Sequence, residues 1–256
     1  MINIHNLVNP RIWESPAKAA IGIAIVVMLI QEWRKGFFRN FRSYPKTVPF
    51  KPYAVIAGLF FILFLLAFSQ DRILLDKVQG LKGPFWSCVL LFGRNIGENI
   101  KFWSILLAFY WISRGLRSAK GSSLAFGALL ASSLTGLLAH ILKSIFMRAR
   151  PYATPNPYSF FNYHEILHHS RAHQSFPSGD VALVAGAAGY LFFSIPNPFF
   201  RLLMLLVPLA NAFARMSLNR HWASDTVAAM GLGLMTALFF WSFKEYQKKT
   251  SPQPRP

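Results

Sequence analysis

Cysteine is almost absent from this chain of 256 residues, and charged residues are scarce. The one cysteine, Cys88, excludes a disulfide framework and any zinc site built from several cysteines. Charged residues make up 14% of the chain, well below the roughly 25% of a typical soluble domain. A soluble enzyme is therefore not expected, and the 54% of hydrophobic residues excludes an intrinsically disordered chain.

Negative charge is especially scarce, since 9 acidic residues stand against 27 lysines and arginines, for a formal charge of +18. In an apolar chain this excess indicates basic loops that face anionic lipid headgroups, or a site for an anionic substrate. Nucleic acid is the rival partner for so basic a protein. The basic residues lie in short segments between apolar runs and form no continuous patch, so we expect no nucleic-acid binding.

Long apolar runs, by contrast, are frequent. Six of them approach the roughly 20 residues that a helix needs to cross a bilayer. They occupy residues 53–68, 102–113 with the preceding turn from about 96, 123–142, 181–195, 202–214 and 226–243. Helices satisfy their own backbone hydrogen bonds in lipid. The runs therefore predict an all-α, polytopic membrane protein, built as a six-transmembrane-helix bundle.

The flanking segments divide the chain into three parts. We expect residues 1–52 to form an N-terminal cytoplasmic or interfacial segment, 53–243 the six-helix membrane domain, and 244–256 a polar cytoplasmic tail. Within the first part, the apolar stretch 19–30 is only about a dozen residues long, which predicts an additional interfacial or partly inserted helix. The alternative for this stretch is a further span.

The distribution of lysine and arginine predicts the orientation of the bundle. Basic residues gather in segments 34–51, 114–120 and 244–255. With six spans these segments share one side of the membrane, which we take as the cytoplasm. The segments 71–101, 143–176 and 215–225 then face the outside. The expected location is the bacterial cytoplasmic (inner) membrane, with a site that faces the periplasm or the exterior.

The outer segments carry polar residues at the ends of the spans. Lys143 and Arg150 are seven residues apart at the end of the third span, a spacing that predicts one shared helix face. Ser178 and Gly179 open the fourth span. Serine is a good N-cap, glycine lets the backbone approach a ligand, and the free N–H groups of a helix N-terminus suit an anion.

A third group, Arg215, His221 and Asp225, lies between the fifth and sixth spans. His221 and Asp225 are four residues apart, so the carboxylate can orient the imidazole and stabilise its charged form. Cations, a helix N-terminus and an oriented histidine on one membrane face predict a phosphate pocket. There Lys143, Arg150 and Arg215 would neutralise phosphate oxygens. His221 would attack phosphorus and form a phosphohistidine.

At these residues the sequence resembles the three-part signature of the type 2 phosphatidic acid phosphatase superfamily. The matching residues are Lys143-x6-Arg150-Pro151, Pro177-Ser178-Gly179 and Arg215-x5-His221-x3-Asp225. The resemblance covers residues 53–243. It implies a six-helix membrane core, no metal or other cofactor, and a phosphohistidine at His221 that Asp225 orients. The positions that match the family's phosphate-binding residues are Lys143, Arg150, Ser178, Gly179 and Arg215.

Asp180 departs from this signature, because the second motif of the family usually ends in a histidine that protonates the leaving oxygen. An aspartate with an ordinary pKa of about 3.9 is a poor acid at neutral pH. Four interpretations remain open: Asp180 is protonated when buried beside phosphate, a nearby histidine replaces it, the leaving group needs little help, or the protein is inactive. The nearby histidines are His164, His168, His169 and His173.

Other residues near the motifs allow two interpretations each. Arg148 and Arg220 are either additional phosphate or headgroup contacts or solvated charges. We interpret the histidines of segment 164–173 as part of a solvated loop or a gate over the pocket rather than a metal site. The aromatic, proline-containing segment 151–163 predicts a rigid loop at the bilayer surface that guides a lipid headgroup.

The sequence thus predicts a metal-independent integral membrane phosphatase that hydrolyses a phosphate monoester or diphosphate on a cell-envelope lipid. The substrate classes that the resemblance allows include lipid A, undecaprenyl diphosphate, phosphatidic acid and phosphatidylglycerol phosphate. The alternatives are a lipid phosphotransferase that uses the same histidine and a non-catalytic lipid-binding or transport homologue. The expected partners are the phosphorylated lipid and the bilayer, with no obligatory protein partner.

Overall fold

The computed structural model describes residues 10–34, 50–163 and 171–250. Within these ranges the chain forms nine α-helices and one short 3₁₀ helix, and it has no strand. The helices are α2 (Pro10–Arg34), α3 (Phe50–Ser69), α4 (Asp71–Gln79), α5 (Pro84–Ile96), α6 (Asn99–Gly115), α7 (Ala119–Phe146), the 3₁₀ helix η3 (Arg171–His173), α8 (Gly179–Ser194), α9 (Pro198–Ser217) and α10 (Ala223–Thr250). The all-α class predicted from the apolar runs is confirmed.

Four of these helices, α3, α7, α9 and α10, are long and apolar enough to cross a membrane. Helix α8 is apolar but has only 16 residues. The second predicted span, residues 102–113, lies within the 17-residue helix α6, but the preceding turn from about residue 96 does not belong to it, because the chain breaks at Gly97 and Glu98 between α5 and α6. A multi-pass membrane protein is thus confirmed, whereas the count of six spans stays a prediction.

The surface of α3 shows why these helices belong in lipid. Its large apolar side chains point outward, and Leu59, Phe61 and Leu66 are each more than half exposed. Soluble monomers rarely expose contiguous apolar patches larger than a few hundred Å². In a bilayer the same side chains meet hydrocarbon, and the backbone hydrogen bonds stay inside the helix.

The bundle is held together where small residues let helices approach closely. Helix α8 packs against α7, α9 and α10, and a Cβ built on Gly233 of α10 would lie 2.6 Å from the Cβ of Ala185 on α8. The hydroxyls of Thr135 on α7 and Thr236 on α10 are hydrogen-bonded to each other. Small residues and hydroxyl contacts of this kind are the usual means of helix association in membranes.

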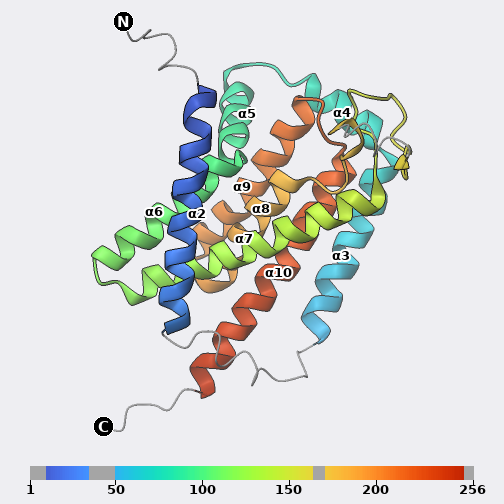
Figure 1. Cartoon of the computed structure of the whole chain (residues 1–256). Coiled ribbons are helices and arrows are strands. Elements are labelled where there is room, and N and C mark those ends of the chain that lie inside the picture. Colours follow the sequence, from blue (N-terminus) through green and yellow to red (C-terminus); the bar gives the residue numbers. More distant parts are fainter. Residues whose placement is uncertain (1–9, 35–49, 164–170, 251–256) are drawn as a thin grey trace, which may run out of the picture.

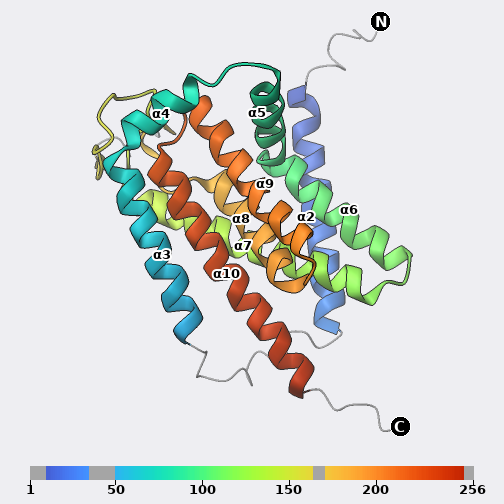
Figure 2. The same ribbon diagram turned by 180° about the vertical axis from the view of Figure 1, so that it is seen from behind.

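The helix ends that carry the motifs gather at one end of the bundle (Figure 1). Helix α4 lies there with the C-terminal ends of α7 and α9 and the N-terminal ends of α8 and α10. Figures 1 and 2 show the C-terminal ends of α2 and α10 and the N-terminal end of α3 at the opposite end. Because α10 alone is 28 residues long, about 42 Å at 1.5 Å per residue, the two ends are a membrane thickness apart.

The flanking segments differ in part from the predicted domain boundaries. Helix α2 has 25 residues, twice the length of the apolar stretch within it, and packs against α6. There Met28 is buried, and the hydroxyl of Tyr110 donates a hydrogen bond of 2.8 Å to Glu32. Helix α10 continues to Thr250, so regular structure runs beyond the predicted boundary at residue 243.

Candidate active site

The end of α7 brings Lys143 and Arg150 together by a different route from the predicted one. The helix ends at Phe146, and Met147 adopts a left-handed conformation with φ of 41°. The prediction that Lys143 and Arg150 share one helix face is therefore wrong, because Arg150 lies in the loop that follows. Both side chains nevertheless reach the carbonyl of Gln174, Lys143 Nζ at 2.7 Å and Arg150 Nη2 at 3.4 Å.

The N-terminus of α8 faces this pair of cations. Ser178 is the N-cap residue and is fully buried, and its backbone N–H donates to the carbonyl of Asp225 at 3.1 Å. Its hydroxyl makes no capping hydrogen bond. A Cβ built on Gly179 would lie 3.4 Å from Lys143 Cε. Gly179 thus borders the space beside Lys143. A larger residue at position 179 would occupy part of the space that is available to a ligand.

His221 and Asp225 form the centre of the site. His221 lies in the short loop between α9 and α10, and its Nδ1 atom is 3.6 Å from Asp225 Oδ2. Both side chains are buried. This distance is slightly longer than a hydrogen bond, and contacts of this kind often shorten when substrate binds. The predicted juxtaposition of the two residues is present in the structure.

The surroundings keep the imidazole neutral. Burial lowers the pKa of His221 to about 4, and the positive charges of Lys143 and Arg150 act in the same direction. The hydrogen-bonding and charge contributions of Asp225 raise the pKa but do not overcome burial. A neutral imidazole has the free lone pair that a nucleophile needs.

Asp225 is positioned by groups that the motifs do not include. Its carboxylate accepts hydrogen bonds from the hydroxyl of Ser175, from the backbone N–H of Trp222 at 2.9 Å and from Arg148 Nη1 at 2.6 Å. The carboxylate is thereby fixed whether or not His221 bonds to it.

Arg148 is fully buried and links two carboxylates. Its Nη1 contacts Asp225 and its Nη2 contacts Asp71 Oδ2, both at 2.6 Å. The guanidinium also lies over the rings of Phe68, Phe160 and Trp222. Both interpretations offered for Arg148 from the sequence, a phosphate contact and a solvated charge, are therefore wrong, because its donors are occupied inside the protein. Arg220, by contrast, is exposed.

Asp71 is the site-supporting residue that sequence reasoning missed. It begins α4, is buried, and accepts hydrogen bonds from the backbone N–H and the hydroxyl of Ser224 at 2.8 and 2.6 Å. The signal that could have found it is an acidic residue immediately after an apolar span, because a carboxylate in such a place needs a partner.

Asp180 forms an ion pair with Arg215, with 3.1 Å between Oδ2 and Nη1. Both side chains are partly exposed to the site, at 28% for Asp180 and 12% for Arg215. The structure thus places Asp180 beside Arg215, a predicted phosphate ligand. Of the four histidines considered as substitutes, His173 lies in η3, and His164, His168 and His169 lie outside the described residues.

Within the described part of the chain, four buried side-chain atoms of the site have no hydrogen-bond partner. They are Arg150 Nε, Ser178 Oγ, Arg215 Nε and His221 Nδ1. A buried donor without a partner costs about 1–3 kcal/mol. Burial also lowers the pKa of the Arg150 guanidinium. His221 Nδ1 faces Asp225, whereas the three donors of Arg150, Ser178 and Arg215 would be satisfied by an anion with several acceptor oxygens, such as phosphate.

The described residues contain no group of three or more histidine, cysteine, aspartate or glutamate side chains that could hold a metal ion. The polar side chains that converge here are mainly cationic or hydroxyl donors. Such a donor set binds the oxygens of an anion directly and does not resemble the oxygen ligands that hard cations require.

Comparison with known proteins finds a family model and a solved structure of similar fold. Residues 123–249 match the family model described as the PAP2 superfamily. No curated protein sequence matches the chain. Among solved structures, the chain is similar to the crystal structure of a transmembrane PAP2-type phosphatidylglycerolphosphate phosphatase from Bacillus subtilis. The identity is 20% and the TM-score 0.52, over 76% of this chain and 96% of that one. At this identity the match shows a shared fold.

Proposed function

Because residues 123–249 of this chain belong to the PAP2 superfamily, we propose that the protein hydrolyses a phosphate monoester or diphosphate on a cell-envelope lipid, as an integral membrane phosphatase. The observation that carries this proposal is the buried His221, held beside Asp225 and near three buried donor atoms that have no hydrogen-bond partner in the protein. A nucleophile next to an anion-binding pocket is the minimum that phosphoryl transfer requires.

In the first step, His221 forms a bond to phosphorus as the bond from phosphorus to the lipid oxygen breaks. Nδ1 faces Asp225, so Nε2 is the attacking atom. The carboxylate holds the ring and stabilises the positive charge that develops on it. Lys143, Arg150 and Arg215 neutralise the phosphoryl oxygens, and the Ser178 hydroxyl and the N–H of Gly179 donate to them. The product is a phosphohistidine and a free lipid.

The leaving oxygen then needs a proton or a good leaving group. Oδ2 of Asp180 is engaged by Arg215 Nη1 at 3.1 Å, an arrangement that suits a hydrogen-bond acceptor rather than a proton donor. This geometry supports the interpretations in which a histidine donates the proton or the leaving group needs little help. A lipid phosphate released from a diphosphate, or an anomeric sugar oxygen, meets the second condition. In the second step, water attacks phosphorus, and the nitrogen–phosphorus bond breaks to release inorganic phosphate.

The experiment that tests this function measures phosphate release by the detergent-purified protein in EDTA. The substrates are lipid phosphates, including phosphatidylglycerol phosphate because the similar Bacillus subtilis protein is named for it. We expect activity from the wild type and a loss of about a thousandfold or more in His221→Ala. The matched control is His140→Ala, which removes an exposed histidine of α7 and should retain full activity. Phosphate release that appears only with an added acceptor lipid would instead identify a phosphotransferase.

We further infer six crossings in the core, formed by α3, α5 with α6, α7, α8, α9 and α10. Helix α6 leads on from the end of α5 toward the opposite end of the bundle (Figures 1 and 2), so the two helices together replace the second predicted span. Helix α2 contains 25 residues, about 38 Å, and its length favours an additional crossing over an interfacial position. The basic helix ends lie opposite the site, which supports a site at the outer face of the cytoplasmic membrane.

A further inference from the structure

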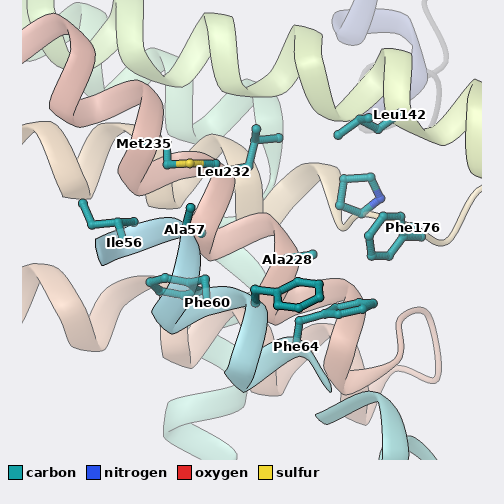
Figure 3. A pocket seen from close by; sticks show the side chains of 12 residues that line it. Ile56, Ala57, Phe60, Phe64, Leu142, Phe176, Ala228, Leu232 and Met235 are labelled. Atoms are coloured by element: carbon teal, nitrogen blue, oxygen red, sulfur yellow. The ribbon is translucent and has the colours of Figure 1, made fainter. Parts of the chain in front are cut away.

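An apolar groove on the side of the bundle ends beside the candidate active site (Figure 3). It has a volume of about 320 Å³ and lies between α3, α10, the end of α7 and the segment that precedes α8. The 12 residues that line it are all apolar, and four of them are the phenylalanines Phe60, Phe61, Phe64 and Phe176. Hydrocarbon is therefore the chemistry that fits this groove.

One end of the groove adjoins three candidate site residues on three separate segments. Its lining residues Leu142 and Pro177 immediately precede Lys143 and Ser178, and Ala228 follows Asp225 by three residues, within one turn of α10. Figure 3 shows Leu142 and Phe176 at this end, and Ile56 and Met235 at the other. The groove thus leads from the phosphate pocket along the bundle into the depth of the membrane.

The length of the groove matches one leaflet. Between Ile56 and Phe64 it follows α3 over eight residue-to-residue steps, which is about 12 Å of helix axis. Half of the hydrocarbon core of a bilayer is about 15 Å. Of two other apolar hollows, the one between α3, α8, α9 and α10 contains no residue within three positions of a candidate site residue. The one between α5 and α9 comes near the site on one segment alone, at Phe213, two residues before Arg215.

We propose that the groove binds one hydrocarbon chain of the lipid whose phosphate occupies the candidate active site, an inference that rests on the proposed phosphatase function. The bilayer is as apolar as the groove, so hydrophobic transfer contributes little to binding. The contribution of the groove is orientation. A chain held along α3 and α10 directs its headgroup toward His221, and an error of about 1 Å in the position of a reacting group costs up to about a hundredfold in rate.

The test fills the groove without touching the site. Ala57 lines the groove on α3, whereas Ala54 is exposed on the same helix and is not among the lining residues. We compare Ala57→Phe with the matched control Ala54→Phe on dioleoyl phosphatidic acid in mixed micelles and on p-nitrophenyl phosphate, which has no hydrocarbon chain. In Ala57→Phe, kcat/KM for the lipid should fall about tenfold or more and stay within about twofold for p-nitrophenyl phosphate. Ala54→Phe should change neither.

Two results would overturn the proposal. An unchanged kcat/KM of Ala57→Phe on the lipid would mean that the groove holds only bulk lipid, and equal losses on both substrates would mean that the substitution acts on the site itself. If Ala57→Phe does not fold, Met235→Ala, which enlarges the far end, must lower kcat/KM for the lipid alone. A wild type that hydrolyses neither substrate would refute the phosphatase function, an outcome distinct from failure of the groove.

Discussion

Asp225 shows how the environment of one side chain decides its role. Three protein groups, Arg148, Ser175 and the backbone N–H of Trp222, hold the carboxylate in place. The positive charge of Arg148 is in turn shared with Asp71. The orientation of His221 therefore depends on a chain of contacts that begins in α4. Arg148 and Asp71 are positioning residues, since neither offers a free donor to the substrate.

This chain of contacts predicts that Arg148→Lys lowers kcat. A lysine is a point charge and cannot contact both carboxylates as the planar guanidinium does. We expect kcat to fall about tenfold or more because Asp225 and His221 shift, whereas KM changes little. Removal of one partner from a buried ion pair also costs about 3–5 kcal/mol of stability. The measurements are steady-state kinetics and thermal unfolding in detergent.

The control for this prediction is Arg114→Lys, which makes the same substitution at an exposed arginine in the last turn of α6 and should leave kcat and stability unchanged. If Arg148→Lys does not fold, Asp71→Asn keeps the shape of the partner and removes its charge, and kcat should fall in that variant too. A folded Arg148→Lys protein with the kcat of the wild type would show that Asp225 does not depend on Arg148.

The low pKa of His221 predicts how stability depends on pH. The pKa is about 4 in the folded protein and 6.5 for an unperturbed histidine. Below about pH 6.5 the unfolded chain binds a proton that the folded chain does not bind until about pH 4, so stability falls as the pH falls through this range. Between about pH 7.5 and about pH 5, this one group lowers the free energy of unfolding by about 2 kcal/mol.

Thermal unfolding of the solubilised protein at these two pH values measures the effect. The wild type should lose more stability on acidification than His221→Ala, which lacks the titrating group. His140→Ala should lose as much as the wild type, because its His221 is intact. Equal losses in the wild type and His221→Ala would contradict a histidine that burial keeps neutral.

At the scale of elements, the sequence predicts helices better than it predicts their ends. The apolar runs identify α3, α7, α8, α9 and α10 because lipid exposure selects apolar residues along a whole helix. The same pattern does not predict the turn at Met147, because methionine rarely adopts the left-handed conformation that it has there. The predicted helix face of Lys143 and Arg150 fails for that reason.

The contact between Arg148 and Asp71 is a harder case for sequence reasoning. The two residues are 77 positions apart, and α4, which carries Asp71, is a short helix outside the apolar runs. The spacing of motif residues predicts which side chains lie close together on one helix. It does not predict which helices contact each other in the folded protein. The candidate phosphate ligands were predictable because three sequence motifs name them. The residues that support Asp225 were not, because Arg148, Ser175 and Asp71 come from separate segments that meet only in the folded protein.

The close approach of α8 and α10 predicts different effects for one substitution at two glycines. At Gly233 an added Cβ would lie 2.6 Å from the Cβ of Ala185, so the helices must separate. At Gly58 of α3 an added Cβ meets nothing within 4 Å. We expect Gly233→Ala to lower the free energy of unfolding by about 1–3 kcal/mol and Gly58→Ala to keep or raise it. Thermal unfolding in detergent separates the two, and equal stabilities would contradict the tight contact.

At the scale of the whole molecule, the arrangement of basic helix ends predicts the topology. Lys82, between α4 and α5, lies at the end that carries the candidate site, whereas Lys120 lies at the start of α7, at the opposite end. Both are exposed. In a Cys88→Ala background, Lys82→Cys should react with a membrane-impermeant thiol reagent on intact cells, and Lys120→Cys should react only after lysis. Reaction of Lys120→Cys on intact cells would reverse the assigned orientation.

The ion pair of Arg148 with Asp71 also shows that residues 123–249, the segment that matches the family model, do not form an independent unit. Every motif residue lies within residues 123–249, which is the segment that matches the family model, yet Asp71 lies outside it. A truncated gene that encoded only that segment would retain the complete motif set and leave a buried guanidinium short of one counter-charge, a defect of about 3–5 kcal/mol. The three motifs are therefore not sufficient by themselves. The candidate site is complete only when the helices that precede residue 123, above all α4 with Asp71, are part of the same chain.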